Sequence, residues 1–120
     1  MKLAGLVGLL VVTSSCGVLG GRSARCDMRP MTPQCTDWRN NLQPTWTVQE
    51  GLCKTLGGTS VGGTFAANQT CDTADMWGGC QVRLGDGSLQ TNWYYKSDTY
   101  KTKESAQAEC DSGMAFVDPG

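Results

Sequence analysis

The stretch Cys80–Ser97, CQVRLGDGSLQTNWYYKS, decides the fold class of this chain. Its first residues alternate apolar and polar side chains, which is typical of a strand with one buried face. The cluster GDGS at 85–88 favours a turn, and the run over 89–97 is rich in aromatic and β-favouring residues. The sequence therefore predicts a β-hairpin across residues 80–97.

Two helices are predicted on either side of this hairpin. The pattern TVQE at 47–50 fits a capping box, and a helix is expected over 48–56 with a stop at Gly57-Gly58. Three apolar residues fall on one face of this helix: Val48, Leu52 and Leu56. Thr102 is expected to cap a second helix over 103–110, and short strands are expected at Thr64-Phe65 and over 114–117. The predicted fold class is a small disulfide-rich α+β domain, a short antiparallel sheet with two helices.

The N-terminal segment has the pattern of an export signal. Lys2 is followed by an apolar stretch over 3–12, which matches the core of a signal peptide and is too short to span a bilayer. The motif Ser14-Ser15-Cys16 resembles the cleavage site of bacterial lipoproteins, in which the cysteine becomes N-terminal and lipidated. Ordinary signal-peptidase cleavage after Gly17 or Gly20 is the alternative.

These features predict three segments: a signal peptide over 1–15, a lipid-anchored tether over 16–25, and a disulfide-stabilised α+β domain over 26–120. The tether lacks apolar periodicity, and its arginines are expected to lie on a solvated arm. Lipidation of Cys16 would place the protein on the bacterial cell envelope with the membrane as a partner. Without lipid, the protein would be secreted and soluble.

The seven cysteines are predicted to divide into one anchor and one disulfide framework. An exported chain meets an oxidising compartment, and the absence of any CxxC motif excludes a zinc ribbon and a thioredoxin-like redox site. Three disulfides are therefore expected among the cysteines that remain after Cys16, namely Cys26, Cys35, Cys53, Cys71, Cys80 and Cys110. The sequence does not fix the connectivity; we expect Cys26–Cys35 as a local bridge, with Cys53–Cys71 and Cys80–Cys110.

The composition excludes several kinds of chemistry. The chain has 120 residues, no histidine and a net charge of −1. Without histidine, a Ser-His-Asp triad, a Cys-His dyad and a histidine-bearing zinc site are excluded. The balanced charge argues against nucleic acid as a partner, because such proteins usually carry a basic stripe.

Acidic residues give only weak candidate sites. Asp72, Asp75 and Asp86 lie near glycines, but their spacing fits no EF-hand loop, so we expect neither a metal nor a cofactor. A glycosidase needs two carboxylates facing across a cleft, and nothing in the sequence pairs the acidic residues in this way. A small secreted hydrolase is therefore the least favoured alternative, and we expect the protein not to be an enzyme.

Aromatic side chains supply the best candidate binding surface. In Trp93-Tyr94-Tyr95, alternate side chains point to opposite faces of a strand, so Trp93 and Tyr95 share one face. Core packing is the simplest role for these rings in a chain with few aliphatic residues. A carbohydrate-binding module is the alternative, and its candidate stacking residues are Trp77, Trp93, Tyr95 and Tyr100.

Cysteines, glycines, tyrosines and one alanine recur in a recognisable order over residues 50–117. They are Cys53, Gly57, Gly58, Cys71, Gly79, Cys80, Tyr94, Tyr95, Ala106 and Cys110. Their order resembles a small cysteine-rich module of exported proteins and lipoproteins from myxobacteria and related deltaproteobacteria. The resemblance implies a location and a fold, and it implies no reaction because these modules have no assigned activity.

The sequence as a whole predicts a non-catalytic exported envelope lipoprotein module for binding or structure. A protein or glycan is the expected partner besides the membrane, and rigid display of a surface on a cross-linked scaffold is the expected mechanism.

Overall fold

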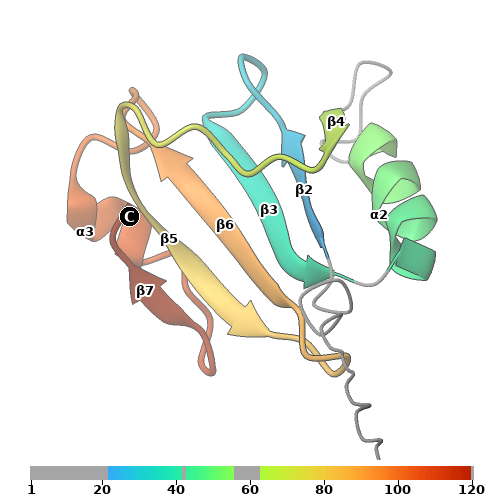
Figure 1. The fold of residues 1–120 in the computed structure, drawn as a ribbon. Coiled ribbons are helices and arrows are strands. Elements are labelled where there is room, and N and C mark those ends of the chain that lie inside the picture. The colour runs from blue at the N-terminus through green and yellow to red at the C-terminus, as the bar shows by residue number, and fades with distance from the viewer. Residues whose placement is uncertain (1–21, 42, 56–62, 120) are drawn as a thin grey trace, which may run out of the picture.

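The computed structural model describes residues 22–41, 43–55 and 63–119 (Figure 1). These residues form a six-stranded sheet in the order β4-β2-β3-β6-β5-β7, in which all neighbours are antiparallel. The sheet is thus larger than the short one expected, and the chain is mostly sheet with little helix. The elements are β2 (Arg22–Asp27), β3 (Gln34–Asn41), α2 (Gln43–Thr55), β4 (Thr64–Ala67), β5 (Met76–Arg83), β6 (Leu89–Tyr95), α3 (Lys103–Gln107) and β7 (Ala115–Val117).

The predicted hairpin is confirmed as β5 and β6. Cys80 lies opposite Asn92, and Gly79 lies opposite Trp93. A Cβ atom at Gly79 would come within 2.8 Å of both the Asn92 carbonyl oxygen and the Trp93 ring, so glycine permits the close approach of the two strands. The short strands expected at Thr64-Phe65 and over 114–117 are confirmed as β4 and β7.

Strands β2 and β3 were not expected from the sequence. Residues 22–25, assigned to the tether, form the first part of β2, which lies between β3 and β4 inside the sheet. The tether assignment is therefore wrong for residues 22–25, which belong to the sheet. In β2 the buried positions are the small residues Ala24 and Cys26, which alternate with Arg25 and Asp27. This alternation carries little hydrophobic signal.

The two faces of the sheet differ in chemistry. Successive residues of a strand point to opposite faces, and the register aligns them across the sheet. We call one side the groove face, from which the side chains of five uncharged residues project: Gln34, Thr36, Trp38, Gln90 and Asn92. We call the other side the ionic face, defined by Arg25, Asp27, Asp37, Arg39 and Trp93.

Both helices lie at the groove face, at opposite ends of the sheet (Figure 1). Helix α2 contacts β2 and β4, and helix α3 contacts β5. On the ionic face, the segment 68–75 crosses the sheet on its way from β4 to β5 (Figure 1). The ionic face is thus covered by a strap of chain, whereas the groove face is covered by helices at its two ends.

Helix α2 is oriented differently from the sequence-based expectation. It begins at Gln43, so Thr47 lies inside the helix and does not cap it. Val48 and Leu52 are 63% and 54% exposed, whereas Gln49 and Cys53 are buried. The expected apolar face therefore points to solvent. The remaining residues of that prediction, Leu56 and Gly57-Gly58, lie outside the described residues.

Helix α3 confirms its predicted start. Thr102 accepts from the Ser105 backbone N–H, and the Ser105 side chain bonds back to the Thr102 backbone, which completes a capping box. The helix ends at Gln107 and so does not reach Cys110 as expected. Ala106 is fully buried and fixes the helix against the sheet.

Each of three small cores contains one disulfide. The bridges are Cys26–Cys53, Cys35–Cys71 and Cys80–Cys110, and they attach α2, the 68–75 strap and the segment after α3 to the sheet. The expected Cys80–Cys110 bridge is confirmed, and the other two expected pairings are wrong. Cys35 lies opposite Asp27 in the register, so Cys26 and Cys35 point to opposite faces and cannot bond.

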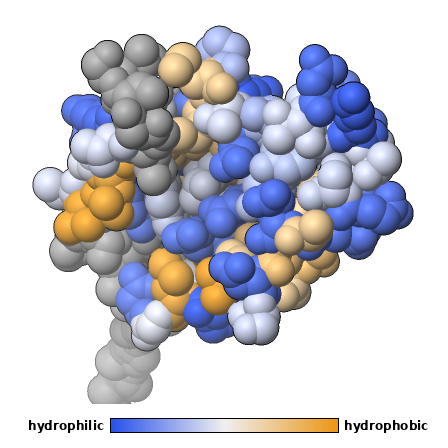
Figure 2. All heavy atoms as spheres, turned by 180° about the vertical axis from the view of Figure 1, so that it is seen from behind, coloured by the Kyte–Doolittle hydropathy of each residue, from blue (hydrophilic) through white to orange (hydrophobic). Residues whose placement is uncertain are grey.

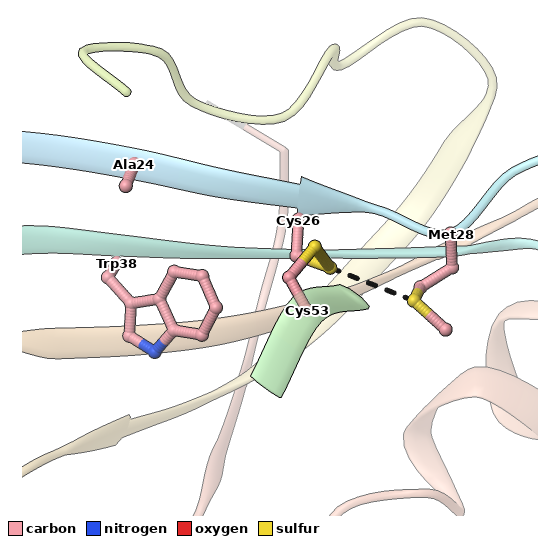
Figure 3. Packing of buried hydrophobic residues seen from close by; sticks show 5 residues of the cluster. All are labelled: Ala24, Cys26, Met28, Trp38 and Cys53. Atoms are coloured by element: carbon pink, nitrogen blue, oxygen red, sulfur yellow. Dashed lines mark hydrogen bonds between the residues drawn. A yellow bond between two sulfur atoms is a disulfide. The ribbon is translucent and has the colours of Figure 1, made fainter. Parts of the chain in front are cut away.

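The core beneath α2 illustrates this arrangement (Figure 3). The Cys26–Cys53 bridge lies among Ala24, Met28 and Trp38, and Cys26 Sγ lies 3.8 Å from Met28 Sδ. The cluster contains few large aliphatic groups, and the disulfide provides a covalent link where apolar burial is small.

Candidate ligand-binding groove

The groove face is hollowed over β3 and β6, between the two helices. The hollow has a volume of about 420 Å³, within the range of ordinary ligand sites. In Figure 2, which views the molecule from behind, the middle of this face is largely hydrophilic, and a strongly hydrophobic patch lies at the edge that carries α2. The lining residues are Met28, Thr32, Gln34, Thr36, Trp38, Leu52, Gln90 and Asn92.

Hydrogen bonds between β3 and β6 fix the floor of the groove. Thr36 and Asn92 are register partners, and the Thr36 hydroxyl donates to Asn92 Oδ1 at 2.9 Å. Trp38 and Gln90 form the next such pair, and the Trp38 indole Nε1–H donates to Gln90 Oε1 at 2.9 Å. These side chains are therefore held in place before any ligand binds.

The same bonds orient the two carboxamides of β6. An indole N–H can only donate, so the oxygen of Gln90 must face Trp38, and the amide N–H groups of Gln90 are directed elsewhere. The oxygen of Asn92 is likewise used by Thr36, and the Asn92 side chain also bonds the Tyr94 hydroxyl. A primary amide has two N–H donors, so each carboxamide retains at least one donor for a ligand.

An acceptor lies at the other end of the floor. Gln34 Nε2 donates to the Tyr100 hydroxyl at 3.1 Å, which leaves the Gln34 carbonyl oxygen to accept from a ligand. Tyr100 meets Tyr94 edge-to-face with ring centroids 5.0 Å apart. Burial raises the pKa of Tyr94 to about 12, and the charge of Glu109 adds to this, so the tyrosine stays neutral near pH 7.

The described lining of the groove carries no charge. None of the eight described residues that line it is ionisable. Leu52, which is 54% exposed, forms an apolar wall on the α2 side. Met31, three residues after the lining residue Met28, is also exposed. The site therefore suits an uncharged ligand that offers both hydrogen-bonding groups and apolar surface.

A second hollow, of about 630 Å³, lies at the ionic face around Arg29. The Arg29 guanidinium lies 4.1 Å from the centre of the Tyr95 ring and donates to both oxygens of Asp27 at 3.0 and 2.8 Å. Asp72 lies 3.4 Å from the same guanidinium. The positive charge of Arg29 is thus paired with Asp27 and Asp72 inside the protein.

The pKa values around Arg29 agree with this internal pairing. The side-chain hydrogen bond to Asp27 raises the pKa of Arg29 above its ordinary value. Burial opposes ionisation of Asp27, but the hydrogen bonds and charge of Arg29 outweigh it and lower the pKa of Asp27. The Asp27–Arg29 pair therefore stays ionised at neutral pH. Through its contact with Asp72, Arg29 also attaches the strap to the sheet.

Asp37 is the most deeply buried charge on the ionic face, with no exposed surface. Its Oδ2 accepts from the Trp93 indole at 3.0 Å and from the Cys71 backbone N–H at 3.1 Å, and it lies 3.4 Å from Arg39. Its other oxygen has no hydrogen-bond partner among the described residues. Asp37 thus links β3, β6 and the strap, which is a structural role.

The aromatic residues considered for the alternative role of sugar binding do not form an exposed platform. Trp93, Tyr95 and Tyr100 are only 4%, 3% and 4% exposed. The predicted division of the aromatic strand, with Trp93 and Tyr95 on one face and Tyr94 on the other, is confirmed, but both faces are covered at these positions. Trp77 is partly exposed; it donates to the Tyr100 carbonyl at 2.8 Å, and Lys96 lies over its ring. Trp93, Tyr95 and Tyr100 thus pack within the protein, as their simplest role predicts, and do not form an open stacking surface.

The other predicted site residues have different outcomes. Cys16 lies outside the described residues, so its lipidation stays a prediction. All six remaining cysteines are in disulfides. Within the described ranges, no three residues of the metal-binding types Asp, Glu, His and Cys are grouped to hold an ion, and no helix has the length and apolar character needed to cross a bilayer.

Sequence reasoning missed the groove residues themselves. Gln34, Thr36, Gln90 and Asn92 are uncharged polar residues, which resemble ordinary solvent-facing strand positions in a single sequence. A usable signal exists in QCTDW at 34–38 and QTN at 90–92, where neutral polar residues recur at every second position. That signal gains meaning only once the strands are known to be neighbours.

Comparison of the chain with protein-family models, with curated proteins and with solved structures finds no match. The resemblance to cysteine-rich modules of myxobacteria therefore stays a prediction.

Proposed function

We propose that this protein is a non-catalytic exported module of the bacterial envelope, anchored through Cys16, that binds an uncharged ligand in the groove between α2 and α3. The α+β domain serves as a rigid scaffold, and the ligand is held by hydrogen bonds to the groove floor and by apolar contact with α2. Recognition of such a ligand needs no metal or cofactor.

The observation that carries this proposal is the pair of oriented carboxamides, Gln90 and Asn92, in a hollow whose described lining is uncharged. Side chains held by their neighbours lose little freedom when a ligand binds, which favours affinity. Proton-transfer chemistry needs an ionisable group within reach of the substrate, and the described lining of the groove offers none. Binding is thus the role that this surface supports best.

The proposed location is supported by the three disulfides, which persist in oxidising compartments outside the cytoplasm. They attach the covering elements on both sides of the sheet, so the scaffold resists the forces and proteases of an external surface. Rigid attachment of this kind also preserves the geometry of a binding site.

An NMR titration tests the groove directly. The ¹⁵N-labelled domain is titrated with two sets of uncharged probes, cello- and chito-oligosaccharides and end-capped peptides, and with charged peptides of equal length. We expect at least one uncharged set to shift the side-chain NH₂ signals of Gln90 and Asn92 and to leave Gln81, on the ionic face, unmoved. Shifts confined to other surfaces, or produced only by charged probes, would contradict the proposal.

Mass spectrometry tests the anchor separately. Intact protein extracted with detergent should carry the mass of a chain that begins at Cys16 with acyl groups. A mature chain that begins at Gly21 without acyl mass would refute the lipoprotein assignment and would favour a soluble secreted form. The groove is unaffected by that outcome.

A further inference from the structure

We infer that the ligand of the groove is an extended, uncharged peptide segment of another protein, which lies along β3 and β6 and is recognised through its backbone. This inference rests on the proposed function, because it names the class of ligand for the same site.

The spacing of the donors on β6 carries the argument. Gln90 and Asn92 are two residues apart on one strand, so their positions repeat at about 6.8 Å. An extended peptide presents carbonyl groups on one edge with the same two-residue period. A peptide that lies along β6 can therefore give one carbonyl to each carboxamide, without any distortion of either chain.

The groove floor also offers the complementary group. The Gln34 carbonyl oxygen, on β3, is free to accept a backbone N–H because the Gln34 amide nitrogen bonds Tyr100. Backbone recognition requires both donors and acceptors, since an extended peptide alternates N–H and C=O along each edge. The floor supplies both kinds of group from fixed side chains.

The α2 wall of the groove fits a side chain of such a peptide. When one edge of an extended backbone lies on the floor, alternate side chains point to the two walls. Leu52 on α2 offers an apolar contact on one wall, and its exposure of 54% leaves surface to be covered by a ligand side chain. The uncharged lining disfavours charged ligand residues, because a charge in the groove would lose water without gaining an ion pair.

A glycan fits the same groove less well. Recognition of a sugar ring typically uses stacking on an open aromatic face, and the rings that the structure describes at this site are closed. Trp38 is 5% exposed, and Tyr94 and Tyr100 are 5% and 4% exposed. The described side chains of the groove thus offer hydrogen-bonding groups and no stacking surface, which favours a peptide backbone over a saccharide.

The test uses isosteric variants of the two carboxamides. Gln90→Glu and Asn92→Asp each keep the oxygen that accepts from Trp38 or Thr36 and remove the N–H donors. The probe is an array of end-capped eight-residue peptides built from Ser, Thr, Asn, Gln, Leu and Val. We expect wild-type protein to bind members of the array and each variant to bind them about tenfold or more weakly, since about one hydrogen bond is lost.

Gln81→Glu is the matched control. Gln81 lies on the ionic face and donates to Thr91, so this variant makes the same charge change on the same sheet and away from the groove. We expect its affinity to stay within about twofold of wild type. Equal loss in Gln81→Glu and Gln90→Glu would refute the inference, because net charge would then explain the effect.

A change in the ligand keeps the test independent of protein folding. Replacing single backbone amides of a bound peptide by esters weakens the carbonyl acceptor, and we expect two substitutions, two residues apart, to weaken binding to wild-type protein. Uniform tolerance of esters would refute backbone recognition.

The NMR titration separates this inference from the proposed function. If oligosaccharides but no peptides shift the Gln90 and Asn92 signals, the peptide inference is wrong and the proposed function stands. If neither kind of probe shifts them, both are wrong.

Discussion

The two faces of the sheet use polar side chains in opposite ways. On the ionic face, a buried carboxylate and two ion pairs connect the sheet and the loop after β2 to the 68–75 strap. On the groove face, neutral amides and hydroxyls bond across β3 and β6 and keep part of their capacity unused. The difference indicates that one face holds the fold together and the other is available for a ligand.

The cost of an unmade bond explains this division. A buried charge without its partners is strongly destabilising, so the ionic face cannot remain open and is covered by the strap. A neutral amide at a partly exposed groove is satisfied by water when no ligand is present. A binding surface built from carboxamides is therefore compatible with a stable unliganded protein.

The largest effect on stability is expected from Asp37→Ala on the ionic face. The change leaves the Trp93 indole and the Cys71 backbone N–H without their buried acceptor. We expect a loss of about 4 kcal/mol in the free energy of unfolding, measured by guanidinium denaturation. Asp37→Asn keeps one oxygen as acceptor and should cost clearly less. Equal losses in the two variants would show that the charge, rather than these bonds, stabilises the face.

The next largest effect is expected from removal of the Cys26–Cys53 bridge. The double variant Cys26→Ser/Cys53→Ser should lose about 3 kcal/mol. Among the described side chains of α2, Val48 and Leu52 face solvent and only Gln49 and Cys53 are buried, so the amides of α2 should lose hydrogen-exchange protection before those of the sheet. If α2 stays as protected as β6, the bridge is not its main attachment.

The corresponding variant at the other end of the groove face sharpens the comparison. Cys80→Ser/Cys110→Ser should cost a similar free energy of unfolding, since the two sequence separations, 27 and 30 residues, are close. The amides of α3 should stay protected from hydrogen exchange, because the capping box at Thr102 and the burial of Ala106 hold this helix in place. Loss of α3 protection equal to that of α2 would contradict this difference between the helices.

Alkaline pH is expected to weaken both faces together. Burial raises the pKa of Tyr94, on the groove face, and of Tyr95, on the ionic face, to about 12. Above about pH 10 the unfolded chain releases these protons, whereas the folded chain keeps them. The free energy of unfolding therefore falls between pH 10 and 12, by about 1.4 kcal/mol per pH unit for each tyrosine. Denaturation at pH 9 and 11 measures the fall. Tyr94→Phe and Tyr95→Phe should each reduce the slope, and an unchanged slope in both would contradict burial as its cause.

The sequence predicted those elements whose local chemistry is strong. The hairpin carries alternation, a turn cluster and β-favouring aromatic residues, and α3 carries a capping pattern at Thr102, so these were found. Strand β2 was missed because its buried residues, Ala24 and Cys26, are small and its remaining positions are polar, three of the four being charged. Its place in the sheet comes from pairing with β3 and β4, which no local pattern shows.

The orientation of α2 and the disulfide pattern were missed for a related reason. The apolar spacing of Val48 and Leu52 predicts a buried face, but the bond from Cys53 to Cys26 turns Gln49 and Cys53 to the sheet. A covalent link of this kind overrides a weak apolar preference. The groove could not be predicted either, since it depends on which strands are neighbours and on the helix faces that remain exposed.

The smallest effect on stability, and the sharpest distinction within one helix, is expected at the exposed apolar residues of α2. Leu52 lines the groove, whereas Val48 does not, although both are more than half exposed. Leu52→Gln and Val48→Gln should each change the free energy of unfolding by less than about 0.5 kcal/mol. Only Leu52→Gln should weaken peptide binding, by removing the apolar wall of the groove. Equal weakening by Val48→Gln would mean that the ligand lies across the outer surface of α2 instead of along β3 and β6.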